Sequence, residues 1–404
     1  MNNISEKMYR INSKIHISNS NNGILKLSHL ENDWEMSISE AILDIINLFN
    51  IPSTIPTALV RIEDKFNIDG SPTIIINKLI EESILVTSVL SSLEKENVEI
   101  GGMFQSPYLT FSQSLKSGAD IMFFGVPYDV SVTNKPGCRF GADYIRKCST
   151  ALLSYREVDG IPTGVWDPRI NRRVLDGIRM VDCGNVFSGV FTRNDEHYCN
   201  IKNIMKLTAE SQIFPVMIGG DHSITLPAVL GMIEHYPKIG VIQFDAHNDY
   251  SGRPEGEYKE YACHSNFMNW LVHNDSVSDV LQIGIRQLEQ KNAISNKITT
   301  LTLPYNKADF ISSIEKLDKT VPYYLTFDVD CFDTSLIRST GTPLPGGYNY
   351  EEVLEMIELI CNEIELIGLD VVELIPSVDD VEGILFSDII YRLISAKNFK
   401  KNKF

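Results

Sequence analysis

Three short stretches of the sequence concentrate histidine and aspartate side chains. They are Gly-Gly-Asp-His-Ser at 219–223, Asp-Ala-His-Asn-Asp at 245–249 and Asp-Val-Asp at 328–330. Carboxylates and imidazoles held close together lose hydration, and the carboxylates repel one another, unless a cation balances them. We therefore predict a metal site, and its six candidate ligands are His222, Asp245, His247, Asp249, Asp328 and Asp330.

The chemistry of this ligand set indicates the kind of metal. Oxygen and nitrogen ligands without a thiolate suit two octahedral divalent ions, with Mn²⁺ favoured and Ni²⁺ also accepted. Two such ions can share a water and lower its pKa towards neutrality, which provides hydroxide for attack on an unreactive carbon. Taken singly, each stretch has a simpler explanation. The stretch 245–249 could be a solvated loop, His222 a buried histidine and Asp328 a helix cap. A calcium loop is excluded because the required Gly and late Glu are missing.

The elements that would position these residues alternate between apolar runs and helical patterns from about residue 100 onward. Apolar runs lie at 120–125, 180–182, 214–218, 241–244, 281–284, 323–327 and 366–370, and helical patterns include 350–364 and 386–394. This alternation predicts a mostly parallel sheet covered on both faces, with the chemistry beyond the carboxyl ends of the strands. If the strand at 241–244 stays extended, Asp245, His247 and Asp249 project to one side.

The first third of the chain has a different pattern. We expect strands at 14–18 and 24–27 around a turn, then three helices, the first capped by Ser37 with Glu40 as its capping-box partner, and then a strand at 84–86. The other two helices are expected after Thr54 and near Ser71. This order predicts a small α+β winged-helix-like domain over residues 1–95, a polar linker at 94–97, and a catalytic domain over residues 96–404.

The overall composition limits the partners. A net charge of −17 over 404 residues argues against nucleic acid, because phosphate contacts need concentrated Lys and Arg, and it favours small cationic substrates. No apolar run is long enough to span a bilayer, and the N-terminus lacks the hydrophobic core of a secretion signal. The seven cysteines include no Cys-x-x-Cys pair, so we expect reduced thiols in a cytoplasmic protein.

The three His/Asp stretches resemble the metal motifs of the ureohydrolase family of arginases and agmatinases. Segments at 125–129, 135–141, 341–347 and 370–373 are also similar to the family, and the resemblance extends over about the last three hundred residues. It implies a three-layer arginase-like α/β fold and a homo-oligomer, a trimer or hexamer. By this resemblance Asp245 and Asp328 bridge two metals. His222 and Asp249 complete the ligands of one metal, and His247 and Asp330 complete those of the other.

Two further residues match functional positions of the family. His264 occupies the place of a proton-shuttling histidine, and an imidazole with a pKa near neutrality can protonate a leaving amine. Glu373 matches a carboxylate that pairs with a guanidinium, a planar cation that favours a bidentate acceptor. A solvated loop histidine and a structural ion pair are the alternatives. Ser265 and Asn266 replace small residues of the family, and the neighbouring Cys263 receives no role, nor does Cys331.

The resemblance implies hydrolysis of a guanidino group to urea and an amine. Hydroxide would attack the guanidinium carbon, Asp249 would orient it and accept its proton, and His264 would deliver a proton to the amine. The loop at 250–262 lacks the Asn/Ser/Thr-rich pattern with which arginases hold a free carboxylate, and residues 101–104 are similar to the agmatinase branch. The leading hypothesis is a peptide arginase that converts arginine residues of a precursor peptide to ornithine. The alternatives are an agmatinase or guanidinobutyrase acting on a small guanidino compound, and an arginase acting on free arginine.

The N-terminal pattern carries the peptide hypothesis. Its element order resembles the leader-peptide recognition domains of enzymes that modify ribosomal peptides, which bind a peptide as an added strand. A packing or oligomerisation extension is the alternative. DNA binding fits poorly, because the helix near Ser71 offers only Lys78 as a cation. Two other classes stay open for the catalytic domain, a deacetylase with a single zinc and a binding protein with an inactive site.

Overall fold

The computed structural model divides into two compact units. The structure describes residues 7–12, 15–19, 25–29, 35–50, 52–65, 71–87, 101–153, 155–158, 160–186, 193–252, 256–288 and 295–397. The first unit consists of Met1–Glu99 with the segments Phe111–Gly118 and Glu157–Pro162, and the second of Ile100–Thr110, Ala119–Arg156 and Thr163–Phe404. The predicted linker at 94–97 lies outside the described residues, as does most of the turn after residue 18.

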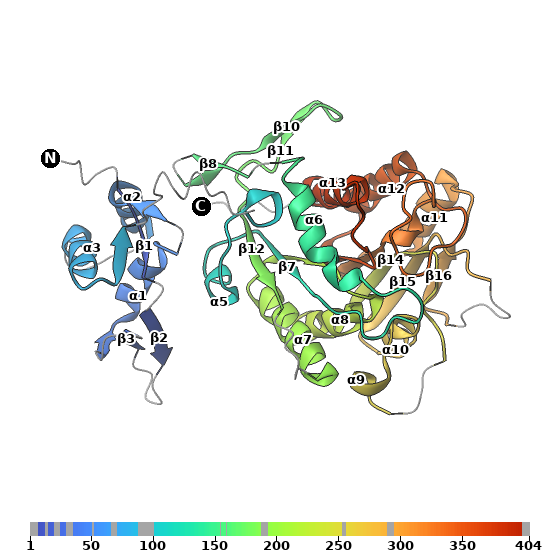
Figure 1. The fold of residues 1–404 in the computed structure, drawn as a ribbon, viewed down its shortest axis with the longest axis horizontal. Helices are drawn as coiled ribbons and strands as arrows, with labels where there is room; N and C mark the ends of the chain where they lie inside the picture. Colours follow the sequence, from blue (N-terminus) through green and yellow to red (C-terminus); the bar gives the residue numbers. More distant parts are fainter. Residues whose placement is uncertain are drawn as a thin grey trace. The chain divides into compact units, whose positions relative to one another are not determined.

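The described part of residues 7–87 contains two small antiparallel sheets and three helices, drawn in blue in Figure 1. The other segments of the first unit add α5 (Phe111–Ser114) and the antiparallel pair of β8 (Glu157–Val158) and β9 (Ile161–Pro162). One sheet has the order β2-β3-β4, and the other has β1 between β5 and β6. The strands are β1 (Met8–Ile11), β2 (Ile15–Asn19), β3 (Leu25–His29), β4 (Glu35–Ile38), β5 (Ser53–Thr54) and β6 (Leu85–Thr87), and the helices are α1 (Glu40–Asn47), α2 (Ile55–Lys65) and α3 (Pro72–Glu81). This arrangement agrees with the expected small α+β class.

One predicted cap in this unit is wrong. Ser37 lies in β4, and the N-cap of α1 is Ser39, whose side chain accepts a hydrogen bond from the backbone N–H of Ile42. The chain stays extended through Ile38 because β4 pairs with β3, so the first helical turn starts two residues later than the capping-box pattern suggested. The apolar face of α1 packs inward, with Ile45 and Ile46 fully buried.

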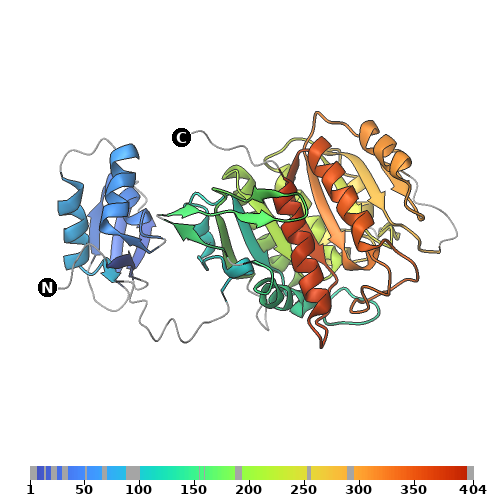
Figure 2. The same cartoon turned by 90° about the horizontal axis from the view of Figure 1, so that it is seen from above.

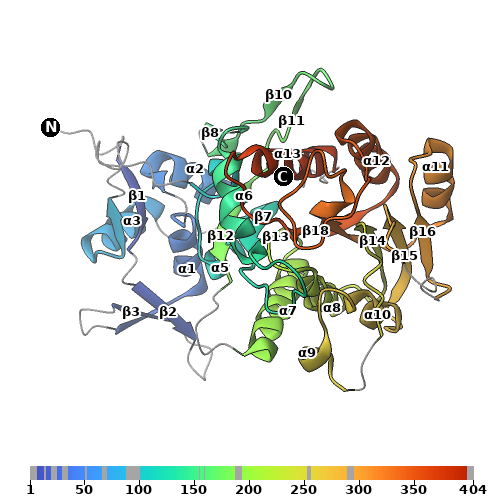
Figure 3. The same ribbon diagram turned by 45° about the vertical axis from the view of Figure 1, so that its right-hand side comes forward.

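The second unit is built on an eight-stranded sheet in which every pairing is parallel. Its order is β12-β7-β13-β18-β17-β14-β15-β16, and Figure 3 shows the end formed by β14, β15 and β16. The strands are β7 (Ile121–Gly125), β12 (Met180–Asn185), β13 (Phe214–Ile218), β14 (Ile239–Phe244), β15 (Val277–Ile283), β16 (Ile298–Leu301), β17 (Tyr323–Asp328) and β18 (Leu366–Val372). All seven predicted strands are present, and the edge strand β16, which is not fully buried, is the addition.

Helices cover both faces of this sheet and complete a three-layer α/β fold (Figure 1). One face carries α6 (Gly141–Ser149), α11 (Lys307–Lys316), α12 (Tyr350–Glu363) and α13 (Val381–Ala396); the other carries α7 (Asn194–Glu210), α8 (Thr225–Ile233) and α10 (Phe267–Val272). Figure 2 looks onto α11, α12 and α13, in orange and red. Each face buries its own apolar cluster, because strands covered on both sides are apolar throughout.

Shorter elements complete the second unit. A two-stranded antiparallel ribbon is formed by β10 (Val165–Asp167) and β11 (Arg172–Val174). The remaining short helices are η2 (Met103–Gln105), η3 (Cys138–Phe140), η4 (His222–Ile224), α9 (Tyr258–Tyr261) and η5 (Val329–Cys331). Among the described residues, no helix has the length and apolar character needed to cross a bilayer.

Candidate metal centre and active site

The six candidate ligands follow the carboxyl ends of neighbouring parallel strands. His222 follows β13, three of the ligands follow β14, and Asp328 and Asp330 lie at the end of β17. In the sheet, β17 pairs with β14 on one side and with β18 on the other, and β18 also pairs with β13. Four adjacent strands therefore deliver their loops to one edge, as the sequence pattern predicts.

The side chains converge in two groups that share Asp245. One group consists of His222, Asp245 and Asp249, and the other of Asp245, His247 and Asp330. His222 Nδ1 lies 3.0 Å from Oδ2 of Asp245 and 3.0 Å from Oδ2 of Asp249. His247 Nδ1 lies 3.5 Å from Oδ1 of Asp245 and 3.0 Å from Oδ2 of Asp330. The two oxygens of Asp245 thus face different groups, which is the arrangement a bridging carboxylate requires.

Asp328 lies beside the first group. Its Oδ2 is 3.3 Å from His222 Nδ1, and its side chain also accepts a hydrogen bond from the backbone N–H of Asp330. The same carboxylate therefore caps η5 and faces the site. Asp328 can therefore serve as a helix cap and as a metal ligand at once, because a carboxylate has two oxygen atoms that can accept.

The geometry around Asp245 differs from the extended strand that the sequence suggested. β14 ends at Phe244, and the following residues form a tight loop in which the N–H of His247 donates to Oδ1 of Asp245 at 2.7 Å. Asp249 has φ 47°, a conformation that costs energy for a non-glycine residue. The three side chains converge because the loop turns, and period-two alternation was the wrong reason for expecting it.

The polar atoms of the site fit divalent cations. Among the described residues, Nδ1 of His222 and Oδ2 of Asp330 are buried and form no hydrogen bond, although an ion-pairing atom lies 3.0 Å from each, and a bound cation would satisfy both. Burial and the charge of Asp245 raise the pKa of Asp249 to about 7. Burial and the charges of Asp330 and Asp245 raise the pKa of Asp328 well above its ordinary value. Cations would relieve this crowding of carboxylates, so the residues suit two metal ions.

Hydrogen bonds behind the ligands hold them in place. His222 Nε2 and Thr326 Oγ1 are 2.8 Å apart, and the Thr326 hydroxyl donates to Oδ1 of the buried Asp370 at 2.6 Å. Gln243 Nε2 donates to Oδ2 of Asp245 at 2.7 Å. The sequence motifs did not indicate that Thr326, Asp370 and Gln243 support the ligands. The available signal was their position, because each is polar within an otherwise apolar strand, where a buried polar group needs a specific partner.

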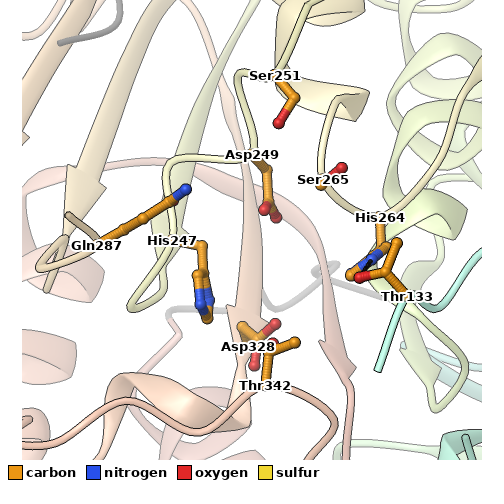
Figure 4. Close-up of a pocket in the computed structure, with 9 residues that line it drawn as sticks. All are labelled: Thr133, His247, Asp249, Ser251, His264, Ser265, Gln287, Asp328 and Thr342. Atoms are coloured by element: carbon orange, nitrogen blue, oxygen red, sulfur yellow. Dashed lines mark hydrogen bonds between the residues drawn. The ribbon is translucent and has the colours of Figure 1, made fainter. Parts of the chain in front are cut away.

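A cavity of about 180 Å³ opens beside the two groups (Figure 4). Its lining consists of Thr133, His247, Asp249, Ser251, His264, Ser265, Gln287, Asp328 and Thr342. The predicted substrate residues lie beside it: His264 is in the lining, and its Nδ1 is 3.7 Å from Oε1 of Glu373. Ser265, which replaces a small residue of the family, is also in the lining. Asn266 is buried and accepts a hydrogen bond from the N–H of Cys263 instead.

Glu373 and His264 have altered proton affinities. Burial and the charge of Asp221 raise the pKa of Glu373 to about 8, and its Oε1 accepts a hydrogen bond from the backbone N–H of His222 at 2.9 Å. Burial, with the charges of His222 and His247, lowers the pKa of His264 to about 4. This differs from the near-neutral imidazole that the sequence analysis expected, because the ring lies inside the site and not at its solvated rim.

Comparison with known proteins agrees with this architecture. The model of the arginase family matches residues 119–395. An agmatinase from Neisseria meningitidis is 30% identical over 301 residues, which cover 71% of this chain and 90% of that protein. The chain belongs to the arginase family. This arginase-family protein is therefore a hydrolase that acts on guanidino C–N bonds, and the agmatinase-like resemblance of the sequence is confirmed.

Solved structures show the same fold. A putative agmatinase from Clostridium difficile has a TM-score of 0.56 and 27% identity, over 69% of this chain and 96% of that chain. A formiminoglutamase from Trypanosoma cruzi, solved with Mn²⁺, has a TM-score of 0.55 and 18% identity, over 69% of this chain and 93% of that chain. The family model begins at residue 119, so it does not include the N-terminal residues 1–118.

Proposed function

We propose that this arginase-family protein hydrolyses the guanidino group of arginine residues within a peptide, releasing urea and leaving ornithine. The observation that carries the proposal is the pair of ligand groups sharing Asp245, with Glu373 and His264 beside the adjoining cavity. We further propose that residues 1–95 form a separate domain that binds the peptide, and that the chain forms a homo-oligomer.

We infer that the six ligands hold two divalent ions, Mn²⁺ by preference. Such ions, when bound, would supply a water that ionises near neutral pH. Two observations support the inference: the buried atoms of His222 and Asp330 that form no hydrogen bond in the described part of the chain, and the division of the Asp245 oxygens between the two groups. The formiminoglutamase of the same fold was solved with Mn²⁺.

The chain's own residues bind the substrate and move its protons. Glu373 is a buried carboxylate beside the site, suited to pair with a guanidinium, which would lower the raised pKa of Glu373. Asp249 is a buried carboxylate of the first ligand group and can accept a proton from the attacking water. The neutral His264 ring, whose pKa burial lowers to about 4, can take that proton at a ring nitrogen and pass it to the leaving amine.

The preference for a peptide over free arginine rests on the first unit and on the loop at 250–262, which lacks the Asn/Ser/Thr-rich pattern. Apart from the candidate ligands and His264, the described lining residues of the cavity carry hydroxyl and amide groups, which can hydrogen-bond a peptide backbone as well as a carboxylate. In the first unit, β2 and β4 are the edges of a three-stranded antiparallel sheet, a structure to which an extended peptide can add as a strand.

A second candidate is hydrolysis of a small guanidino compound such as agmatine. It is supported by the relatives, because the aligned protein from Neisseria meningitidis is an agmatinase and the alignment covers 90% of it. The neutral hydroxyl and amide oxygens of the cavity could also accept hydrogen bonds from the ammonium group of agmatine.

The two candidates are separated by measuring urea from the Mn²⁺-loaded full-length protein with agmatine, arginine and an arginine-containing peptide. We expect the highest kcat/KM with the peptide, and mass spectrometry of the product should show arginine converted to ornithine. A parallel preparation of Asp249→Asn corrects for contaminating ureohydrolase. Rapid turnover of agmatine with none of the peptide would overturn the peptide proposal, and urea from none of the three would overturn both candidates.

A further inference from the structure

His264 is held by the loop that joins β7 to η3, far away in the sequence. Ser131 Oγ accepts a hydrogen bond from the backbone N–H of His264 at 3.0 Å, and the N–H of Ser131 donates to Oδ2 of Asp221 at 3.0 Å. Two residues further on, Thr133 Oγ1 lies 3.0 Å from Nε2 of the His264 ring. One short loop therefore connects the residue preceding His222 with both the backbone and the ring of His264.

The Thr133 hydroxyl contacts the His264 ring directly. Among the described residues it is the one hydrogen-bond partner of that ring, and it leaves Nδ1 facing Glu373 at 3.7 Å. A hydroxyl can donate to a neutral imidazole nitrogen and accept from a protonated one. The contact can therefore persist while the ring gains and loses a proton. Figure 4 shows Thr133 against His264 at the wall of the cavity.

We propose that Thr133 is a positioning residue for catalysis, which holds the His264 imidazole in the orientation needed for proton transfer to the leaving amine. The proposal rests on the proposed guanidino hydrolysis. Thr133 itself is exposed and polar, so its hydroxyl adds little to the core. Its expected influence is on the chemical step, because a small misplacement of a proton-transfer group lowers the rate much more than it weakens substrate binding.

The test compares Thr133→Val, which keeps the shape and loses the hydroxyl, with Thr133→Ser, which keeps the hydroxyl. The assay uses whichever of agmatine or arginine peptide the unsubstituted protein hydrolyses. For Thr133→Val we expect kcat to fall about tenfold, with KM changed by less than about twofold. Thr133→Ser should retain most of the rate. Thr320→Val, an exposed threonine whose hydroxyl bonds to Asp318, is the matched control and should behave as the unsubstituted protein.

A double-mutant cycle separates positioning from a general effect on the loop. If Thr133 acts through the imidazole, Thr133→Val should cause no further loss of kcat in a protein that already carries His264→Ala. An equal loss in both backgrounds would overturn the proposal, as would a Thr133→Val protein with unchanged kcat. Absence of urea from the unsubstituted protein would overturn the proposed function and this assignment with it, so the two failures are distinguishable.

Discussion

The two ligand groups share Asp245 but differ in their enclosure. In the first, His222, Asp245 and Asp249 are all buried, and the His222 side chain is 1% exposed. In the second, the His247 side chain is 18% exposed and lines the cavity. A closed group holds an ion in a set geometry, whereas an open group leaves a coordination position for water or substrate. Asp249 and Asp328 also line the cavity, so both groups face it, and they differ in the enclosure of their histidines.

The two groups also differ in the hydrogen bonds that neighbouring side chains make to their histidines. Nε2 of His222 is bonded to Thr326, which is bonded in turn to Asp370. In the described part of the chain, the ring of His247 has no hydrogen bond beyond the ligand carboxylates. Such outer hydrogen bonds orient a ligand and raise metal affinity, often by about 10–100-fold. We therefore expect the His222 group to bind its ion more tightly than the His247 group does.

The largest effect is expected where the two groups meet. Asp245→Asn removes a carboxylate charge from both groups while keeping the size of the side chain. We expect the bound metal to fall from about two ions per chain to less than one, and urea release to fall about a thousandfold. Metal content by atomic emission, measured after dialysis, checks the first outcome. A protein that retains both ions would show that Asp245 does not bridge them.

A smaller and unequal effect is expected from removing each histidine. His222→Asn and His247→Asn each delete one nitrogen ligand, and each should lower the metal content. We expect His222→Asn to lower the melting temperature more, because it leaves buried carboxylates without their nearest partner, whereas water can replace the partly exposed ring of His247. Differential scanning calorimetry of both metal-loaded variants makes the comparison. Equal losses would show that enclosure does not distinguish the groups.

Most of the catalytic unit was predictable because its signals are local. Apolar runs of strand length and His/Asp stretches at their ends predicted the parallel sheet and the convergence of six side chains. The turn that brings Asp249 into place was not predictable, because its φ of 47° depends on contacts formed only in the fold. The cap at Ser39 was missed for a similar reason, since the pairing of β4 with β3 delays the helix.

Long-range partners were beyond the sequence pattern. Nothing local in Ser131 and Thr133 indicates that they contact His264, more than a hundred residues later. The apolar run 323–327 was predicted as a strand, and Thr326 within it did not stand out until the structure placed its hydroxyl against His222. Sequence spacing thus identifies residues that share a strand end, whereas the residues that orient them come from neighbouring elements.

The smallest expected effect is on the pH dependence of the stability of the metal-free protein. It concerns the His222 group, because Glu373 accepts a hydrogen bond from the backbone N–H of His222. The folded pKa of Glu373, about 8, exceeds its ordinary value of 4.5. Its contribution to stability is therefore fully present below the ordinary pKa and is lost as the pH rises through about 8.

In EDTA, we expect the melting temperature to fall between about pH 5 and pH 8, and Glu373→Gln should reduce that fall because the amide does not titrate. The exposed Glu358→Gln serves as control and should leave the fall unchanged. Equal slopes for the unsubstituted protein and Glu373→Gln would mean that this carboxyl is solvated, and the enclosure assigned to the His222 side of the site would then be wrong.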